Sequence, residues 1–89
     1  MASVLIFNDK QGQADIQMEA VAAAGHEVEI VLAYNVPDAV NALQTRMTAR
    51  IWDILVLDID IQQVDPFGGI WIYNQLVTAG CRAQWKVLV

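Results

Sequence analysis

The sequence is poor in residues that hold small proteins together through covalent or metal links. Among 89 residues there is one cysteine, Cys81, and one histidine. A lone cysteine excludes an intrachain disulfide and a cysteine-based zinc site, so we expect Cys81 to be a small buried or half-buried hydrophobic residue. No apolar stretch approaches the roughly 18 residues of a membrane span, and the first apolar run is too short for a signal-peptide core. We therefore expect a cytoplasmic protein with no membrane partner.

Basic residues are also scarce, with five lysines and arginines against ten acids, for a net charge of −5. The five bases are scattered along the chain. Nucleic acids and anionic lipids both require clustered positive charge, so neither is expected as a partner. In contrast, hydrophobic residues make up 56% of the sequence, above the roughly 45–50% of an average domain. This excess indicates either a large core or an apolar surface for a partner.

The chain has the length of one domain, residues 1–89. Apolar runs alternate with helical patterns. Strands are expected at Val4–Phe7, Glu27–Ala33, Asp53–Asp58 and Trp85–Val89, and helices at Gln11–Ala24, from Asn35 to about Arg50, and at Ile70–Ala79. Strands that alternate with helices through short connections predict an α/β fold with a parallel sheet and right-handed crossovers.

The character of each run predicts its place in the sheet. Val4–Phe7 and Asp53–Asp58 are continuous apolar runs, typical of strands buried on both faces, whereas Glu27–Ala33 begins with polar and apolar alternation, typical of an edge strand. Asn35, Pro37 and Asp38 form a helix start, and Gly25 and Gly80 are expected to end helices. The stretch from Asp65 to Gly69, which contains Pro66 and a glycine pair, is expected to be a loop with turn chemistry.

The first helix is expected to have two apolar stripes. One is Ala14, Met18, Val21 and Ala22, and the other is Ile16, Ala20, Ala23 and Ala24. Two stripes predict contact with the sheet and with something else.

Acidic residues follow two of the expected strands. Asn8 and Asp9 end the first strand, and Asp58 ends the third, with Asp60 two residues later. Ligands of doubly wound sheets bind outside the carboxyl ends of the strands, where the strand order reverses. If these two strands are neighbours, Asp9 and Asp58 face each other, and their repulsion calls for a cation. Oxygen ligands select a hard ion, so we expect a Mg²⁺ site suited to phosphoryl chemistry.

These segments resemble the receiver domain of a response regulator. The resemblance rests on Val4–Asp9, on the stretch from Ala22 to Val28, on Asp53–Asp60, and on Pro66 with Gly68 and Gly69. It spans the whole chain and implies a flavodoxin-like parallel sheet of strand order 2-1-3-4, with helices on both faces and without the family's C-terminal α-β-α portion.

The resemblance also implies a role for each acidic position. Asp58 corresponds to the aspartate that accepts a phosphoryl group from a histidine kinase or a phosphotransfer protein. Asp9 corresponds to a direct Mg²⁺ ligand, Asn8 to a ligand acting through water, and Asp60 to a residue whose backbone carbonyl contacts the metal. Such a domain is a phosphoacceptor rather than an enzyme.

Two features depart from the family pattern. Asn8 stands where the family usually has a second acid, which lowers the charge of the metal site and predicts weak Mg²⁺ binding. The family's Ser/Thr after the fourth strand, its Lys on a fifth strand and its aromatic switch residue have no counterpart, because Lys86 lies within the expected fourth strand. We therefore expect a receiver truncated after that strand, with phosphorylation that is slow, labile or absent.

Other functions are compatible with parts of the sequence. Asp58-Ile59-Asp60 also resembles the nucleophile motif of haloacid-dehalogenase-type phosphatases, but the further acids of such enzymes are missing downstream. A flavodoxin-like cofactor module would need a phosphate-binding loop, and residues 8–13 contain one glycine and no Ser or Thr. The main alternative is a receiver remnant that serves as an oligomerisation module. An open apolar edge at Trp85–Val89 and the stripe that includes Ile16 and Ala20 predict a homodimer.

Overall fold

The chain folds into four strands and three helices that alternate along the sequence. The computed structural model describes residues 1–58 and 68–89. The elements are β1 (Ser3–Asn8), α1 (Gln11–Ala23), β2 (Glu27–Leu32), α2 (Val36–Ala49), β3 (Ile54–Leu57), α3 (Gly68–Thr78) and β4 (Trp85–Leu88). The turn expected at Asp65 and Pro66 lies outside the described residues. Within the described part of the chain, no helix has the length and apolarity needed to cross a membrane.

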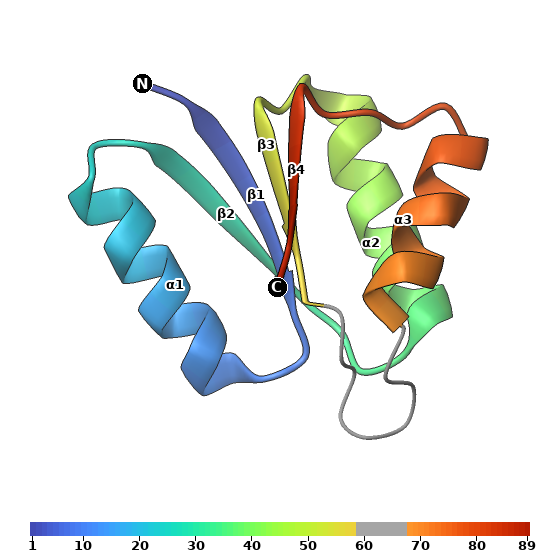
Figure 1. Ribbon diagram of the computed structural model, residues 1–89, viewed down its shortest axis with the longest axis horizontal. Helices are drawn as coiled ribbons and strands as arrows, with labels where there is room; N and C mark the ends of the chain where they lie inside the picture. The colour runs from blue at the N-terminus through green and yellow to red at the C-terminus, as the bar shows by residue number, and fades with distance from the viewer. Residues whose placement is uncertain (59–67) are drawn as a thin grey trace.

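The four strands form one parallel sheet in the order β2-β1-β3-β4, which confirms the predicted α/β fold and strand order. α1 lies on one face of this sheet, and α2 and α3 lie together on the other (Figure 1). β1 and β3 are therefore the inner strands, and the strand order reverses between them. A reversal of this kind is where parallel sheets bind their ligands.

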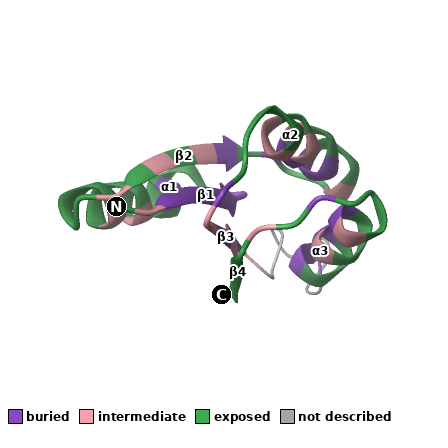
Figure 2. Ribbon diagram, turned by 90° about the horizontal axis from the view of Figure 1, so that it is seen from above, coloured by how far each residue is buried: buried purple, intermediate pink, exposed green. Residues whose placement is uncertain are grey.

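The main core lies between the sheet and the α2–α3 layer. Alternate residues of the inner strands point to this layer because side chains alternate across a strand. The largest fully buried side chains of the core are Leu5, Phe7, Leu43, Leu55, Leu57, Ile72 and Leu76. Figure 2 shows that β1 is buried along its length, whereas β4 is exposed. Cys81 is buried beside this core, as predicted.

Local signals set the ends of the helices. The Asn35 side chain accepts a hydrogen bond from the Asp38 backbone N–H at 2.9 Å, which confirms it as the N-cap of α2. Gly25 and Gly80 have φ values of +87° and +81°, which glycine adopts without strain. After each glycine the next N–H bonds back into the helix, from His26 to Val21 and from Cys81 to Leu76. Both helix ends are therefore Schellman motifs.

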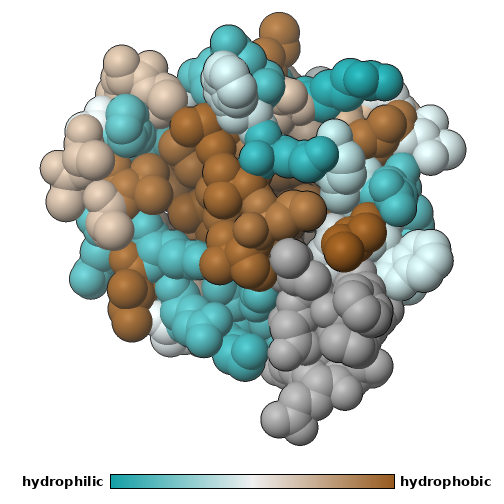
Figure 3. All heavy atoms as spheres, viewed as in Figure 1, coloured by the Kyte–Doolittle hydropathy of each residue, from teal (hydrophilic) through white to brown (hydrophobic). Residues whose placement is uncertain are grey.

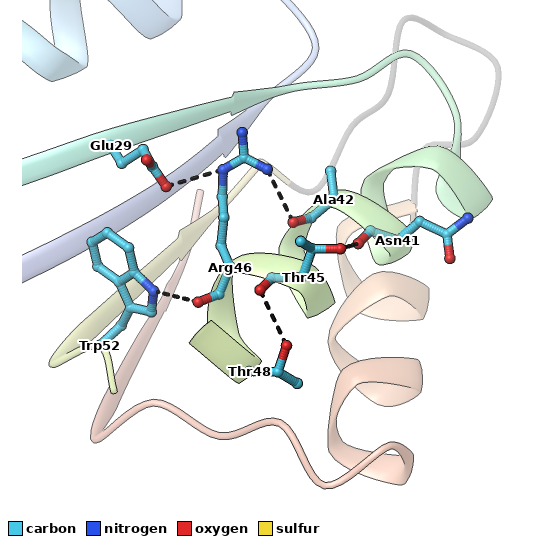
Figure 4. Close-up of polar contacts among 7 residues, drawn as sticks. All are labelled: Glu29, Asn41, Ala42, Thr45, Arg46, Thr48 and Trp52. Atoms are coloured by element: carbon cyan, nitrogen blue, oxygen red, sulfur yellow. Dashed lines mark hydrogen bonds and ion pairs between the residues drawn. The ribbon is translucent and has the colours of Figure 1, made fainter. Parts of the chain in front are cut away.

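The end of α2 is joined to the sheet by polar contacts. The Arg46 guanidinium lies 3.0 Å from the Glu29 carboxylate on β2, and the Trp52 indole N–H donates to the Arg46 carbonyl at 3.2 Å (Figure 4). Arg50 pairs with Glu27 and also lies over the Trp52 ring. The acidic residues that alternate along the β2 edge are thus matched by arginines from α2.

One prediction about burial was wrong. β3 is not buried on both faces, since Ile54 and Val56 remain partly exposed on the α1 side. The cause is that α1 packs on β1 and β2 and leaves the β3–β4 half of that face open. In α1 itself, Ala14 of the first expected stripe is buried, whereas Ile16 of the second stripe is exposed.

The start of α3 also differs from the prediction. The helix begins at Gly68 rather than at Ile70, so the glycine pair belongs to its first turn. Glycine is a poor helix former, which is why the sequence favoured a loop there. Both glycines are buried, and this packing outweighs the low propensity.

The Asp53 side chain joins the start of β3 to the start of β1 through hydrogen bonds with Ser3. Its carboxylate accepts hydrogen bonds from the Ser3 backbone N–H at 2.8 Å and from the Ser3 hydroxyl at 3.1 Å. These two hydrogen bonds hold the pKa of Asp53 below its ordinary value, and the one from the Ser3 backbone N–H has the larger effect. A carboxyl whose pKa is lower in the folded state stabilises the fold above its unfolded pKa, and this contribution is lost as pH falls through the folded pKa.

We therefore expect Asp53→Asn to lower the melting temperature at neutral pH and to have much less effect in acid. In acid the wild-type carboxyl is itself protonated and accepts weaker hydrogen bonds. Thermal unfolding of both proteins, followed by circular dichroism at neutral pH and well below the pKa of Asp53, measures the difference. An equal loss at both pH values would contradict a role for the charge.

Candidate functional site

The predicted acidic residues lie at the carboxyl ends of the two inner strands. Phe7 of β1 and Leu57 of β3 are register partners. Asn8 at the end of β1, with Asp9 directly after it, and Asp58 directly after β3 therefore leave the sheet side by side. The Asp58 backbone N–H donates to the Phe7 carbonyl at 3.3 Å, which extends the pairing to the last position. The sheet thus brings Asp9 and Asp58 to the point of reversed strand order, as the sequence predicted.

The burial of this site is greater than the sequence indicated. Asp9 is 0% exposed and Asn8 is 1% exposed, and Asp58 is half-buried with its Oδ2 atom enclosed. Carboxylate oxygens are the ligands that Mg²⁺ prefers, so the donor set of Asp9 and Asp58 fits that ion.

The remaining metal contact that the resemblance implies, the Asp60 carbonyl, lies outside the described residues. Within residues 1–58 and 68–89, no cluster of three or more His, Cys, Asp or Glu side chains is placed to hold a metal. A cation bound by Asp9 and Asp58 would therefore complete its shell with water, backbone carbonyls or oxygens of a phosphoryl group. Mg²⁺ commonly keeps several waters and binds through one or two carboxylates.

Asn8 has a local structural role that the sequence did not reveal. Its Oδ1 atom accepts a hydrogen bond from the Lys10 backbone N–H at 2.9 Å, and its Nδ2 atom donates to Gln17 Oε1 at 3.1 Å. The first contact is an Asx turn that directs the chain from β1 into α1. The second depends on how α1 lies over the strand end, so no sequence signal marked Gln17 as a neighbour of the site.

Lys86 lies away from this end of the sheet. It is in β4 opposite Leu55, and its ammonium is 4.1 Å from the centroid of the Tyr73 ring on α3. The carboxyl ends of the strands lie beyond Leu57, so Lys86 is placed to support α3 rather than the acidic site.

Comparisons with protein-family models, with curated proteins and with solved structures found no match to this chain. The functional argument therefore depends on the fold and on the acidic residues at the sheet end.

The amide at position 8 provides a test of the metal site. We expect Asn8→Asp to bind Mg²⁺ more tightly, because a third carboxylate adds attraction of about 1 kcal/mol or more, roughly a 5-fold gain in affinity. Its oxygens can still accept from Lys10, and the Gln17 amide can turn to donate to them. Calorimetric titration with Mg²⁺ compares the two proteins, and tighter binding by the wild type would contradict the charge argument.

Proposed function

We propose that this protein is a phosphoacceptor module of a two-component phosphorelay, which takes a phosphoryl group on Asp58. The observation that carries the proposal is the pairing of β1 with β3, which brings the buried Asp9 beside Asp58 at the switch point of a parallel sheet. Carboxylates collected at such a point are usually functional, because ligands of parallel sheets bind where the strand order reverses.

The chemistry requires a nucleophile on Asp58. One carboxylate oxygen of Asp58 attacks phosphorus and forms a new P–O bond, while the bond from phosphorus to the donor breaks and the donor leaves with the electron pair. From acetyl phosphate the leaving group is acetate, and from a phosphohistidine it is the imidazole. The product is an acyl phosphate on Asp58, and no oxidant or reductant is required.

Asp9, Asp58 and the Asp60 carbonyl are the groups that would hold Mg²⁺, with Asn8 acting through water. When bound, the ion supplies positive charge that offsets the charge of the transferring phosphoryl group. Asp9 directly follows β1, whose register with β3 ends at Phe7 and Leu57, and this position beside the end of β3 supports the role. The natural donor in this proposal is a cytoplasmic histidine kinase or phosphotransfer protein, and the module accepts the phosphoryl group without being an enzyme.

Intact-mass measurement after incubation with acetyl phosphate and Mg²⁺ tests the proposal. The expected result is a gain of one phosphoryl group that requires the metal ion. A mass that stays unchanged with and without Mg²⁺, in protein that is folded by circular dichroism, would overturn it.

The open half of the sheet favours a second candidate function, a receiver remnant that acts as an assembly module. Trp85, Val87 and Val89 are exposed on β4 and just beyond it, and a parallel sheet is normally covered on both faces. This function requires no phosphorylation, so an unchanged mass together with a defined oligomer would support it over the first.

A further inference from the structure

The side of α1 that faces the sheet contains one polar residue. Of the 13 residues of this helix, Ala14, Gln17 and Val21 are the three that are not exposed, and their spacing places them on one side of the helix. The exposed part of α1 carries hydrophilic and hydrophobic residues next to each other, as the left of Figure 3 shows, and its polar groups can bond to water. A polar side chain turned toward a sheet needs a partner in the protein, because its withdrawal from water otherwise costs free energy. Gln17 therefore requires a hydrogen-bond partner at the sheet.

The partner of Gln17 is Asn8, the last residue of β1. Side chains alternate across a strand, and Leu5 and Phe7 belong to the core beneath α2 and α3, so Asn8 points to the α1 side. Asn8 is 1% exposed, and both polar atoms of its side chain are bonded: Nδ2 donates to Gln17 Oε1 at 3.1 Å, and Oδ1 accepts from the Lys10 backbone N–H at 2.9 Å. A backbone N–H can only donate, so Lys10 determines which atom of the Asn8 amide is the oxygen. Gln17 must then present its own oxygen to the Asn8 nitrogen.

Asp9 lies between the two residues that the Asn8 side chain joins. The bond from the Lys10 N–H to Asn8 Oδ1 closes an Asx turn around Asp9, which is 0% exposed. Rotation of the Asn8 side chain would break the bond to Lys10, and the bond to Gln17 opposes that rotation. The orientation of the chain at Asp9 therefore depends on a contact with α1, outside the two strand ends that carry the carboxylates.

We infer that Gln17 is a positioning residue of the acidic site, which acts through Asn8 to hold Asp9 in the orientation that binds Mg²⁺. The inference rests on the proposed function, in which Asp9 and Asp58 are the carboxylates that would hold this ion. Outer residues that fix the orientation of a metal ligand commonly change the affinity for the metal by roughly 10-fold or more when they are replaced. Gln17 therefore belongs to the site although it lies on the helix and not at a strand end.

The alternative is a purely structural role, in which the bond between Asn8 and Gln17 only joins α1 to β1. Its loss would then lower the free energy of unfolding and leave the affinity of the folded protein for Mg²⁺ unchanged. Under the inference, the affinity itself falls, because Asp9 is no longer held in one orientation before the ion arrives. Stability and affinity are therefore measured separately, at a temperature where each variant is folded.

Nuclear magnetic resonance of the isotope-labelled 89-residue chain, titrated with magnesium chloride, is the test. Gln17→Met keeps the length of the side chain but removes the amide oxygen, and methionine is a good helix former, so the variant is expected to fold. Before magnesium is added, the signals of the Asn8 side-chain amide should shift in the variant, because its Nδ2 atom loses its acceptor. During the titration, the backbone signals of Asp9 and Asp58 should give a dissociation constant for Mg²⁺ about 10-fold higher than that of the wild type.

Gln75→Met is the matched control, since Gln75 is exposed on α3 and the same substitution there should leave the dissociation constant unchanged. Gln17→Glu is the rescue variant, because a carboxylate oxygen can still accept from Asn8, so it should bind Mg²⁺ at least as tightly as the wild type. Wild-type affinity in Gln17→Met, or a loss that Gln17→Glu shares, would overturn the inference and leave the proposed function standing. A wild-type chain whose Asp9 and Asp58 signals do not respond to Mg²⁺ would overturn both, so the two failures are distinguishable.

Discussion

Asp58→Asn is expected to abolish the gain in mass that acetyl phosphate and Mg²⁺ give the wild-type chain. An amide at this position lacks the negatively charged oxygen that attacks phosphorus, so the expected effect is complete loss of labelling rather than a reduced rate. The backbone hydrogen bond from the Asp58 N–H to the Phe7 carbonyl does not involve the side chain. Circular dichroism of the variant checks that it is folded, so that intact-mass spectrometry reports on the acceptor chemistry.

Two further variants test whether labelling depends on Asp9 and on an acidic residue away from the site. Asp9→Asn should retain the acceptor but label more slowly and with a weaker dependence on Mg²⁺, because it removes one of the two carboxylates that would hold the ion. Asp15→Asn is the control, since Asp15 is an exposed carboxylate on α1, away from the strand ends, and its loss should change nothing. Labelling that persists in Asp58→Asn would assign the phosphoryl group to another residue.

Leu43→Ala is expected to remove most of the stability of the fold. Leu43 is 0% exposed on α2, in the core between that helix and the sheet. Truncation of a buried leucine costs about 3–5 kcal/mol through lost burial and the cavity that remains. Domains have only about 0.05–0.15 kcal/mol of stability per residue, so this loss takes a large part of the total for so short a chain.

Urea denaturation followed by circular dichroism measures the change in the free energy of unfolding. Leu32→Ala is the matched control, because Leu32 ends β2 with 37% of its surface exposed. Partial exposure reduces the area that truncation returns to water, so a cost of about 1 kcal/mol is expected there. Equal costs at the two leucines would place the core elsewhere than between the sheet and α2.

The strand order and the helix ends could be predicted because the signals for them are local. Val4–Phe7 is a continuous apolar run that belongs in a parallel sheet, and Asn35 is a capping residue just before a helix. The pairing of Asp9 with Asp58 followed from strand order in the same way. These features depend on the residues of one segment and on the rules of parallel sheets.

The local signals did not predict which strands of the sheet α1 covers. Ile54 and Val56 are as apolar as buried residues, and their exposure depends on where α1 lies relative to β3 and β4, which is a tertiary property. The full burial of Asp9 and the contact between Asn8 and Gln17 depend on the same placement. The sequence therefore identified the residues of the candidate site but not how far the site is enclosed.

The bond between Ser3 and Asp53 has a consequence for how the molecule folds. It joins residues 50 positions apart, and the pairing of β1 with β3 spans the same distance. β1 and β3 can pair only after the long segment between them has closed into a loop. The chain loses the conformational entropy of that closure before the pairing of the strands stabilises it. Contacts so distant in sequence slow folding. The rate-limiting event in refolding is therefore expected to be the docking of β3 on β1, with the β1–α1–β2 unit formed beforehand.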